Sequence, residues 1–318
     1  LTLGCGGSGG LEGPVIPVGE DMGAGWGSIF KIFNSDDLRA FQMAGIAAAV
    51  CTLLNTPFAA AIFAAEVVYS ERIVYRTFLY SIFAVLAAYS LNTSLMHTTV
   101  LFHADLHTSH YTLYEYLQVA LVALFCSAPA GFGVKFGFVY LKKQFQRFPI
   151  VTRAPIGAIM AASIALVLWY TLHIAPDHIL GMGENTISDI LSNTPHAHLD
   201  VWWILFIIVI AKILATGFTL MSGGSAGLLV PAMVIGGASG SGMYYLLDQF
   251  HLVANLNPDL FAIAGIASSL VAVIEVPIAS IVLTMEMFGA TFAPPAMLAV
   301  AVCHLVVKNL KLYVGKDA

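Results

Sequence analysis

The stretch Gly6-Gly7-Ser8-Gly9-Gly10-Leu11-Glu12-Gly13-Pro14 lies near the start of the chain, and a related stretch occurs near its other end. The counterpart is Gly223-Gly224-Ser225-Ala226-Gly227-Leu228-Leu229-Val230-Pro231, at an offset of 217 residues. We call residues 6–14 the first glycine block and residues 223–231 the second glycine block. A match of this length within one chain indicates an internal repeat.

A second pair of matching segments follows in the same order, at an offset of 220 residues. Ala44-Gly45-Ile46-Ala47 corresponds to Ala264-Gly265-Ile266-Ala267, and further matches join Pro57 with Pro277 and Glu66 with Glu286. Internal repeats in a membrane protein are typical of transporters, whose site lies at the interface between the repeats. We expect one transmembrane core over 1–318, with repeat halves at roughly 1–150 and 151–318. Whether the halves are inverted is left open by the sequence.

Composition places the chain in a lipid bilayer. Of its 318 residues, 59% are apolar and only 10% are charged, too few charges to keep a soluble domain of this size dispersed. We predict an all-α, multi-pass integral membrane protein with broken and tilted helices, placed in a bacterial inner membrane. Because the chain starts at Leu1 within a Gly-rich run, we expect earlier helices to precede it. The stretches apolar enough to span the bilayer are 77–92, 113–134, 156–172, 201–221 and 278–307.

Loops rich in Lys and Arg alternate with loops that lack them. The segments 93–111 and 173–200 contain neither residue, so the positive-inside rule places these two loops outside and the basic loops in the cytoplasm. Lys212 lies within an apolar stretch and has no explanation in this pattern. The net charge of −5 gives no indication of a nucleic-acid partner. The basic residues cluster near 31–39, 72–76, 142–153 and 308–316.

Each glycine block passes from glycine into an apolar run with proline near the junction. Proline suits the first turn of a helix, and glycine lets a backbone approach a ligand closely. Such a loop delivers a helix N-terminus into the protein interior, where free N–H groups and the helix dipole favour an anion. Neither block contains Lys or Arg, so an ion held by partial charges stays free to leave. Close helix packing is the alternative for Gly19, Gly23, Gly236 and Gly240.

Glu12 is the most informative single residue, because a carboxylate inside a membrane-embedded block is costly and usually functional. At a helix N-terminus its side chain can occupy the place of the anion. A protonated or displaced Glu12 leaves the path open, which makes this residue a candidate gate. Glu66 and Glu286 each end an apolar helix just before a loop, where a structural or interfacial role is favoured.

Two serines, four cysteines and a group of histidines bear on other kinds of chemistry. Ser8 and Ser225 lie in Gly-x-Ser-x-Gly patterns typical of a nucleophile. The alternative to a transport protein is therefore an enzyme, an intramembrane serine protease with His304 as its base. A serine duplicated in both repeats indicates loop structure instead, so we do not expect an enzyme. The four cysteines show no metal-binding spacing, and no cofactor is expected. Four histidines lie on one predicted outside loop, where they could either bind zinc or simply face water: His97, His103, His107 and His110.

These residues resemble a known family. Gly10-Leu11-Glu12-Gly13-Pro14 resembles the G-[K/R]-E-G-P motif of the CLC chloride channels and transporters, and Gly227-Leu228-Leu229-Val230-Pro231 resembles their G-x-F-x-P motif. The segment from Asn55 to Glu66 is similar to the helix that follows the gate in that family. The likeness covers essentially the whole chain.

The resemblance implies an inverted repeat and a homodimer with one pore per subunit. It implies Glu12 as the gate and chloride as the bound ion, with protons as a second partner in some members. Family members also use a serine loop that would precede this chain, and their cytoplasmic regulatory domains would follow it. The anion-binding positions implied by the resemblance are Leu11, Gly13, Leu228, Leu229, Val230 and, through its hydroxyl, Tyr313.

Three positions depart from the pattern of the family. Leu11 replaces the basic residue before the gate, and Leu229 replaces the motif Phe. Proton-coupled members are similar to one another in a second, cytoplasmic glutamate, and its position here is Val67. An apolar side chain cannot relay protons, so we expect a chloride channel or a weakly proton-coupled transporter. A Cl⁻/H⁺ antiporter with a different inner proton path is the alternative, and a fluoride-exporting relative is a variant.

Overall fold

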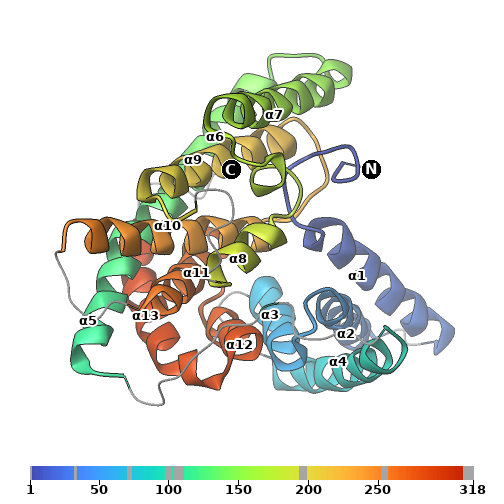
Figure 1. Ribbon diagram of the computed structural model, residues 1–318. Coiled ribbons are helices and arrows are strands. Elements are labelled where there is room, and N and C mark those ends of the chain that lie inside the picture. Colours follow the sequence, from blue (N-terminus) through green and yellow to red (C-terminus); the bar gives the residue numbers. More distant parts are fainter. Residues whose placement is uncertain are drawn as a thin grey trace.

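The structure is a computed structural model that describes residues 2–31, 34–69, 74–96, 102, 111–192, 199–251 and 257–310. Within these ranges the chain forms helices, and the only strand-like contacts are two isolated bridges between loops. The prediction of an all-α fold is confirmed (Figure 1).

The helices are divided here at the boundary predicted between the two repeat halves, near residue 150. Those of the first half are α1 (Glu12–Ile29), α2 (Ser35–Leu54), α3 (Pro57–Tyr69), α4 (Tyr75–Met96), α5 (Leu113–Val122), the π-turn η1 (Ala123–Ser127) and α6 (Ala128–Phe145). Those of the second half are α7 (Ile150–Leu172), the 3₁₀ turn η2 (Pro176–His178), α8 (Glu184–Leu191), α9 (Trp202–Met221), α10 (Leu229–Gln249), α11 (Pro258–Ile274), α12 (Pro277–Phe288), the 3₁₀ turn η3 (Ala290–Phe292) and α13 (Ala293–Leu310).

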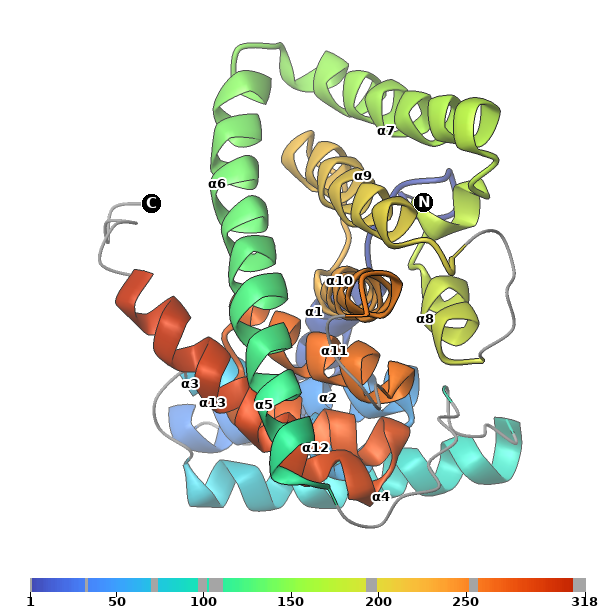
Figure 2. The same cartoon turned by 60° about the vertical axis from the view of Figure 1, so that its left-hand side comes forward.

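Six helical stretches of the described chain are long and apolar enough to cross a membrane. Four of them match stretches predicted from the sequence, and Ser35–Leu54 is an additional one. The predicted stretch 278–307 is divided between two helices: its later part forms the sixth candidate span, Ala290–Val307, whereas its first part is the shorter helix α12, which ends at Phe288. Gly289 separates them with a φ of 117°, a left-handed conformation that suits glycine and ends a helix. Figure 2 shows α5 and α6 as one long rod, with α7 crossing near its end.

Matching glycines pack two helix pairs, α1 with α2 and α10 with α11. A Cβ added to Gly19 would meet the carbonyl oxygen of Gly45, and a Cβ on Gly236 would meet that of Gly265. Both pairs therefore depend on direct backbone contact, as small-residue motifs allow in membranes. Close packing is thus the observed role of Gly19 and Gly236. The same contact in both halves supports the predicted repeat.

The short helices α3 and α12 cap one another. Glu286 near the end of α12 accepts the N–H groups of Phe58 and Ala59 at the start of α3, at 2.9 and 2.8 Å. In return, Glu66 of α3 accepts those of Ile278 and Ala279 at the start of α12, at 3.0 and 2.7 Å. Each carboxylate satisfies two N–H groups that no helix can satisfy internally, and it also meets the positive end of the helix dipole. The predicted structural role of both glutamates is observed.

Replacing Glu66 with leucine is expected to destabilise the protein by about 2 to 4 kcal/mol, because two N–H groups at the start of α12 lose their acceptors. A lower thermal unfolding midpoint in detergent measures this effect. Asp21→Asn is the matched control, since Asp21 is an exposed acid on a helix. Equal midpoints for Glu66→Leu and the unaltered protein would contradict the capping role.

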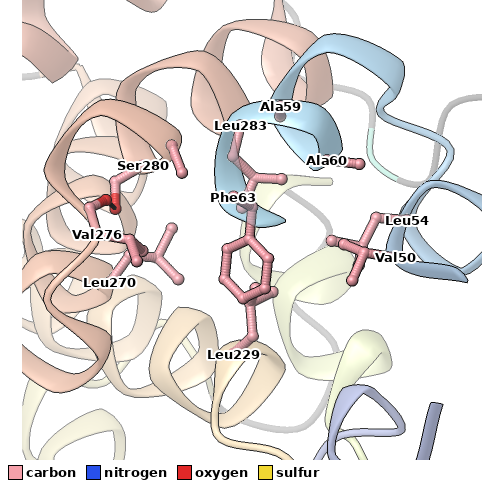
Figure 3. Close-up of a pocket in the computed structure, with 11 residues that line it drawn as sticks. Val50, Leu54, Ala59, Ala60, Phe63, Leu229, Leu270, Val276, Ser280 and Leu283 are labelled. Carbon is pink, nitrogen blue, oxygen red and sulfur yellow. Dashed lines mark hydrogen bonds between the residues drawn. The ribbon is translucent and has the colours of Figure 1, made fainter. Parts of the chain in front are cut away.

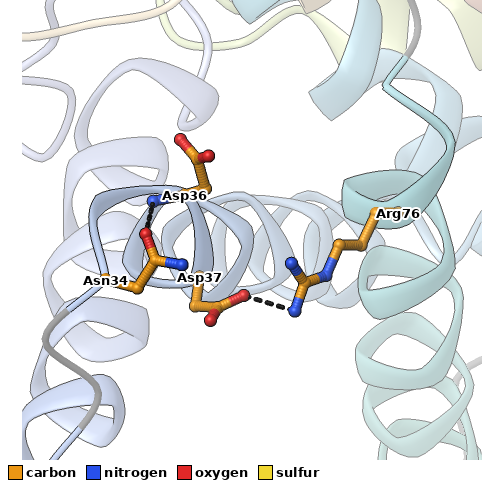
Figure 4. A network of polar contacts seen from close by, with 4 residues as sticks. All are labelled: Asn34, Asp36, Asp37 and Arg76. Carbon is orange, nitrogen blue, oxygen red and sulfur yellow. Dashed lines mark hydrogen bonds and ion pairs between the residues drawn. The ribbon is translucent and has the colours of Figure 1, made fainter.

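Ion pairs join helices of the described chain. Asp37 in the first turn of α2 pairs with Arg76 of α4 at 2.6 Å, and Asn34 caps α2 by accepting the N–H of Asp36 (Figure 4). Lys135 of α6 pairs with Glu275, the residue that follows α11. Arg76 belongs to a basic cluster that the charge pattern places in the cytoplasm, whereas Lys135 lies outside those clusters.

Candidate anion-binding site

The two glycine blocks meet at equivalent residues. Gly10 donates its N–H to the carbonyl of Gly227 at 2.8 Å, and Gly227 donates to the carbonyl of Gly10 at 2.6 Å. These glycines differ by the repeat offset of 217 residues, and they form an isolated antiparallel bridge. An antiparallel pairing of equivalent residues is what a two-fold relation between the halves produces, which supports an inverted repeat.

Glu12 is the first residue of α1, and its side chain lies in the interior with 2% of its surface exposed. Neither carboxylate oxygen has a hydrogen-bond partner in the described part of the chain. The carboxylate lies against Gly10 and Gly227, the glycines that come shortly before the two helices. The negative group therefore lies between the N-terminal ends of α1 and α10.

Four backbone donors surround this position. The N–H groups of Glu12 and Gly13 begin α1, and those of Leu229 and Val230 begin α10. None of the four has an acceptor among the described residues. Pro14 and Pro231 follow them and contribute no N–H. The arrangement can bind one anion by backbone dipoles alone, in the manner of other helix N-termini.

Glycine makes the room that the Glu12 carboxylate fills. A Cβ on Gly10 would overlap the carboxylate, and all three of its nearest atoms belong to the Glu12 side chain. A Cβ on Gly227 would also overlap a carboxylate oxygen of Glu12. Gly13 lies directly against the backbone of Ala226 and Gly227. The glycines of both blocks are thus needed at the site as well as in the loops.

The loop at 179–183 holds the first glycine block through hydrogen bonds. Gly9 donates its N–H to the carbonyl of Gly181 at 3.1 Å, and the hydroxyl of Ser8 donates to the carbonyl of Ile179 at 2.8 Å. Lys212 of α9 is fully buried and donates to the same two carbonyls, at 3.0 Å for Gly181 and 3.2 Å for Ile179. Lys212 therefore anchors the loop that holds the glycine block.

The structure brings together most of the positions predicted for the anion. Leu11 and Leu228 precede the two helices, and Gly13, Leu229 and Val230 lie in their first turns. Tyr313 and the histidines at 97, 103, 107 and 110 lie outside the described residues. Val67 lies on the last turn of α3 and is 38% exposed, next to the capping Glu66.

Sequence reasoning missed the supporting loop and the role of Lys212. The residues at 179–183 carry no motif, and their contacts join segments about 170 residues apart, such as Ser8 and Ile179. The signal that was available is Lys212 itself, a charge within an apolar span. Such a residue is a functional candidate by default.

Comparison with known proteins agrees with this geometry. A family model described as the voltage gated chloride channel matches residues 1–308. An uncharacterized protein of Methanocaldococcus jannaschii is 26% identical, over 96% of this chain and 72% of its own length. The H(+)/Cl(-) exchange transporter ClcA of Vibrio campbellii is 26% identical, over 90% of this chain. The chain spans 59% of the length of that transporter.

A solved structure shares the fold. The crystal structure of a CLC-type fluoride/proton antiporter superposes with a TM-score of 0.78 and 24% sequence identity. The match covers 96% of this chain and 71% of the other. With the family model matching nearly every residue and the fold shared throughout, this chain is an integral membrane protein of the CLC family, the voltage-gated chloride channel family.

Proposed function

We propose that this protein moves chloride across a membrane past Glu12, through the site between the N-termini of α1 and α10. The observation that carries the proposal is the position of the Glu12 carboxylate. It is buried, has no hydrogen-bond partner among the described residues and faces donors from both repeats. A carboxylate there acts as a tethered anion that competes with chloride. Its protonation or movement frees the site.

The proposed ion is a small anion bound without a cofactor. The donors at the start of α1 and α10 are backbone N–H groups with no Lys or Arg among their neighbours in sequence, which favours binding that is weak enough for rapid release. Chloride is the anion favoured by family membership. Fluoride is the variant to test, because one structural relative is a fluoride/proton antiporter.

Proton coupling is proposed to be weak or absent. A pocket of about 10 Å³ lies between α2, α3, α10 and α12, lined by Val50, Phe63, Leu229 and Leu283 (Figure 3). It joins Leu229 at the anion site to Phe63, one turn before Val67 on α3. A cavity of this size holds about one water molecule, so it offers no continuous proton path. These observations favour a channel or a weakly coupled transporter.

The antiporter alternative needs another inner proton path. Glu66 is the acid nearest in sequence to Val67, but both of its oxygens already accept N–H groups of α12. Both oxygens are thus engaged in capping α12, so Glu66 has no free oxygen to offer a proton path. The relatives that exchange protons keep this alternative open to test.

The protease alternative is disfavoured by the surroundings of Ser8. Its hydroxyl contacts the carbonyl of Ile179 and the hydroxyl of Thr216, at 2.8 and 3.0 Å, and neither group is a general base. His304 is exposed on α13. Ser8 therefore has the contacts of a loop residue.

The test is chloride efflux from liposomes that hold the whole protein, recorded together with internal pH. We expect chloride efflux with little or no linked proton movement. Proton uptake against its gradient, driven by chloride, would establish the antiporter alternative. Absence of any chloride efflux would remove the central proposal. The same assay with fluoride in place of chloride decides between the two anions.

We further propose a homodimer with one pathway in each subunit, in a bacterial inner membrane. Family membership supports this assembly. Light scattering of the detergent-solubilised protein, corrected for bound detergent, is expected to give the mass of two chains.

A further inference from the structure

Glu184 has surroundings that the proposed gate does not explain. It begins α8, directly after Gly183 in a left-handed conformation with a φ of 93°. Its side chain is half-buried and makes no hydrogen bond or ion pair with the described residues. The nearby Asp177 differs, since it is exposed and accepts a hydrogen bond from Asn185 at 3.1 Å. A half-buried carboxylate without a partner is costly.

The backbone around Glu184 is fastened to the backbone around Glu12. Gly181 donates its N–H to Gly7 at 3.0 Å and accepts that of Gly9 at 3.1 Å. A Cβ on Gly183 would meet the side chain of Val234, one turn beyond Val230 on α10. Glu184 is therefore held beside the first turns of α10, on the side that the charge pattern places outside.

The two carboxylates affect each other. The hydrogen bonds between Gly181 and the first glycine block hold Glu184 near Glu12, where its negative charge repels the Glu12 carboxylate. In the described chain, the charged or titratable groups on α8 and next to it include Asp177, His178, Asp189 and Lys212. His178 contacts the hydroxyl of Thr186 at 3.1 Å, and Lys212 uses its donors on two carbonyls. None of these groups pairs with Glu184 within the described chain, so the repulsion toward Glu12 is not cancelled by an ion pair.

We propose that Glu184 is a second carboxylate of the outer gate, which sets the pH at which Glu12 releases the anion pathway. The inference rests on the proposed gating role of Glu12. Glu184 acts through Glu12 as a positioning charge and does not bind the anion. Its negative charge favours the protonated, released form of Glu12, so the pathway opens at a higher pH than it would without Glu184.

The test is the pH profile of chloride efflux for a charge series at one position. Glu184→Gln is expected to move the midpoint of activation to lower pH by about half a unit to one unit, a roughly three- to ten-fold change in proton concentration. Glu184→Lys is expected to move it further in the same direction. A purely structural role would give no graded dependence on charge. Asp177→Asn is the control, with an unchanged midpoint.

The Glu12→Gln background separates the two proposals. If Glu12→Gln removes the pH dependence while Glu184→Gln leaves the midpoint of the unaltered protein in place, the role of Glu184 is refuted and the gate stands. If Glu12→Gln leaves the pH dependence intact, the gate is refuted, and the role of Glu184 falls with it. A midpoint that moves equally for Glu184→Gln and Asp177→Asn would also refute a specific role.

Discussion

Glu12→Gln is expected to raise chloride efflux at neutral pH by about ten-fold or more and to remove its dependence on pH. A carboxylate and an anion about 4 Å apart repel by roughly 4 kcal/mol at an effective dielectric constant of 20, so the ionised side chain excludes chloride from the site. Glutamine has nearly the same shape and no charge, which reproduces the protonated state. Efflux from liposomes over a series of pH values measures both effects.

Glu20→Gln provides the matched control for this experiment. Glu20 lies two turns further along α1 and is not part of either glycine block. We expect its replacement to leave the efflux and its pH dependence as in the unaltered protein. Identical profiles for Glu12→Gln and Glu20→Gln would show that Glu12 is not the gate.

Gly10→Ala is expected to open the pathway without changing any charge. The three atoms nearest to the added Cβ all belong to the Glu12 side chain, which is flexible and can swing away. Overpacking of this kind costs about 1 to 3 kcal/mol, enough to change the ratio of displaced to blocking Glu12 side chains by about five- to 150-fold. We expect efflux at neutral pH to approach that of Glu12→Gln.

The double variant shows whether Gly10 acts through Glu12. Adding Gly10→Ala to Glu12→Gln is expected to give little further increase, because the two changes act on the same gate and are not additive. Gly25→Ala, on α1, is the control, since a Cβ there meets no other atom within 4 Å. Efflux that stays low in Gly10→Ala would indicate that the carboxylate does not block the path from this position.

The matched glycine blocks allowed much of the fold and the site to be predicted. Glycine and proline act locally, so a loop that delivers a helix N-terminus can be recognised from a few neighbouring residues. Glu12 was recognisable for a similar reason, since its charge is out of place in a membrane segment. The break at Gly289 was missed because the apolar run continues through it, and only the backbone conformation shows where α12 ends.

The hydrogen-bond partners of the buried polar residues could not be predicted from the sequence. Glu66 and Glu286 could be identified as structural from their places at helix ends, but their acceptor role depends on which helix each one meets. The contacts of Lys212 and the position of Glu184 likewise depend on the loop at 179–183. The contacts of that loop are set by the packing of segments far apart in the sequence. A motif gives the chemistry of a residue, whereas its partner is decided by the tertiary fold.

The mutual capping of α3 and α12 has a consequence for how the protein is made. Phe58 emerges from the ribosome 228 residues before Glu286, which caps its helix. During synthesis the N–H groups at the start of α3 have no access to Glu286 until nearly the whole chain has been translated. The first half therefore cannot reach its final state alone, and assembly of the pathway becomes a late event. Truncation before residue 286 should leave the first half exposed to quality-control proteases.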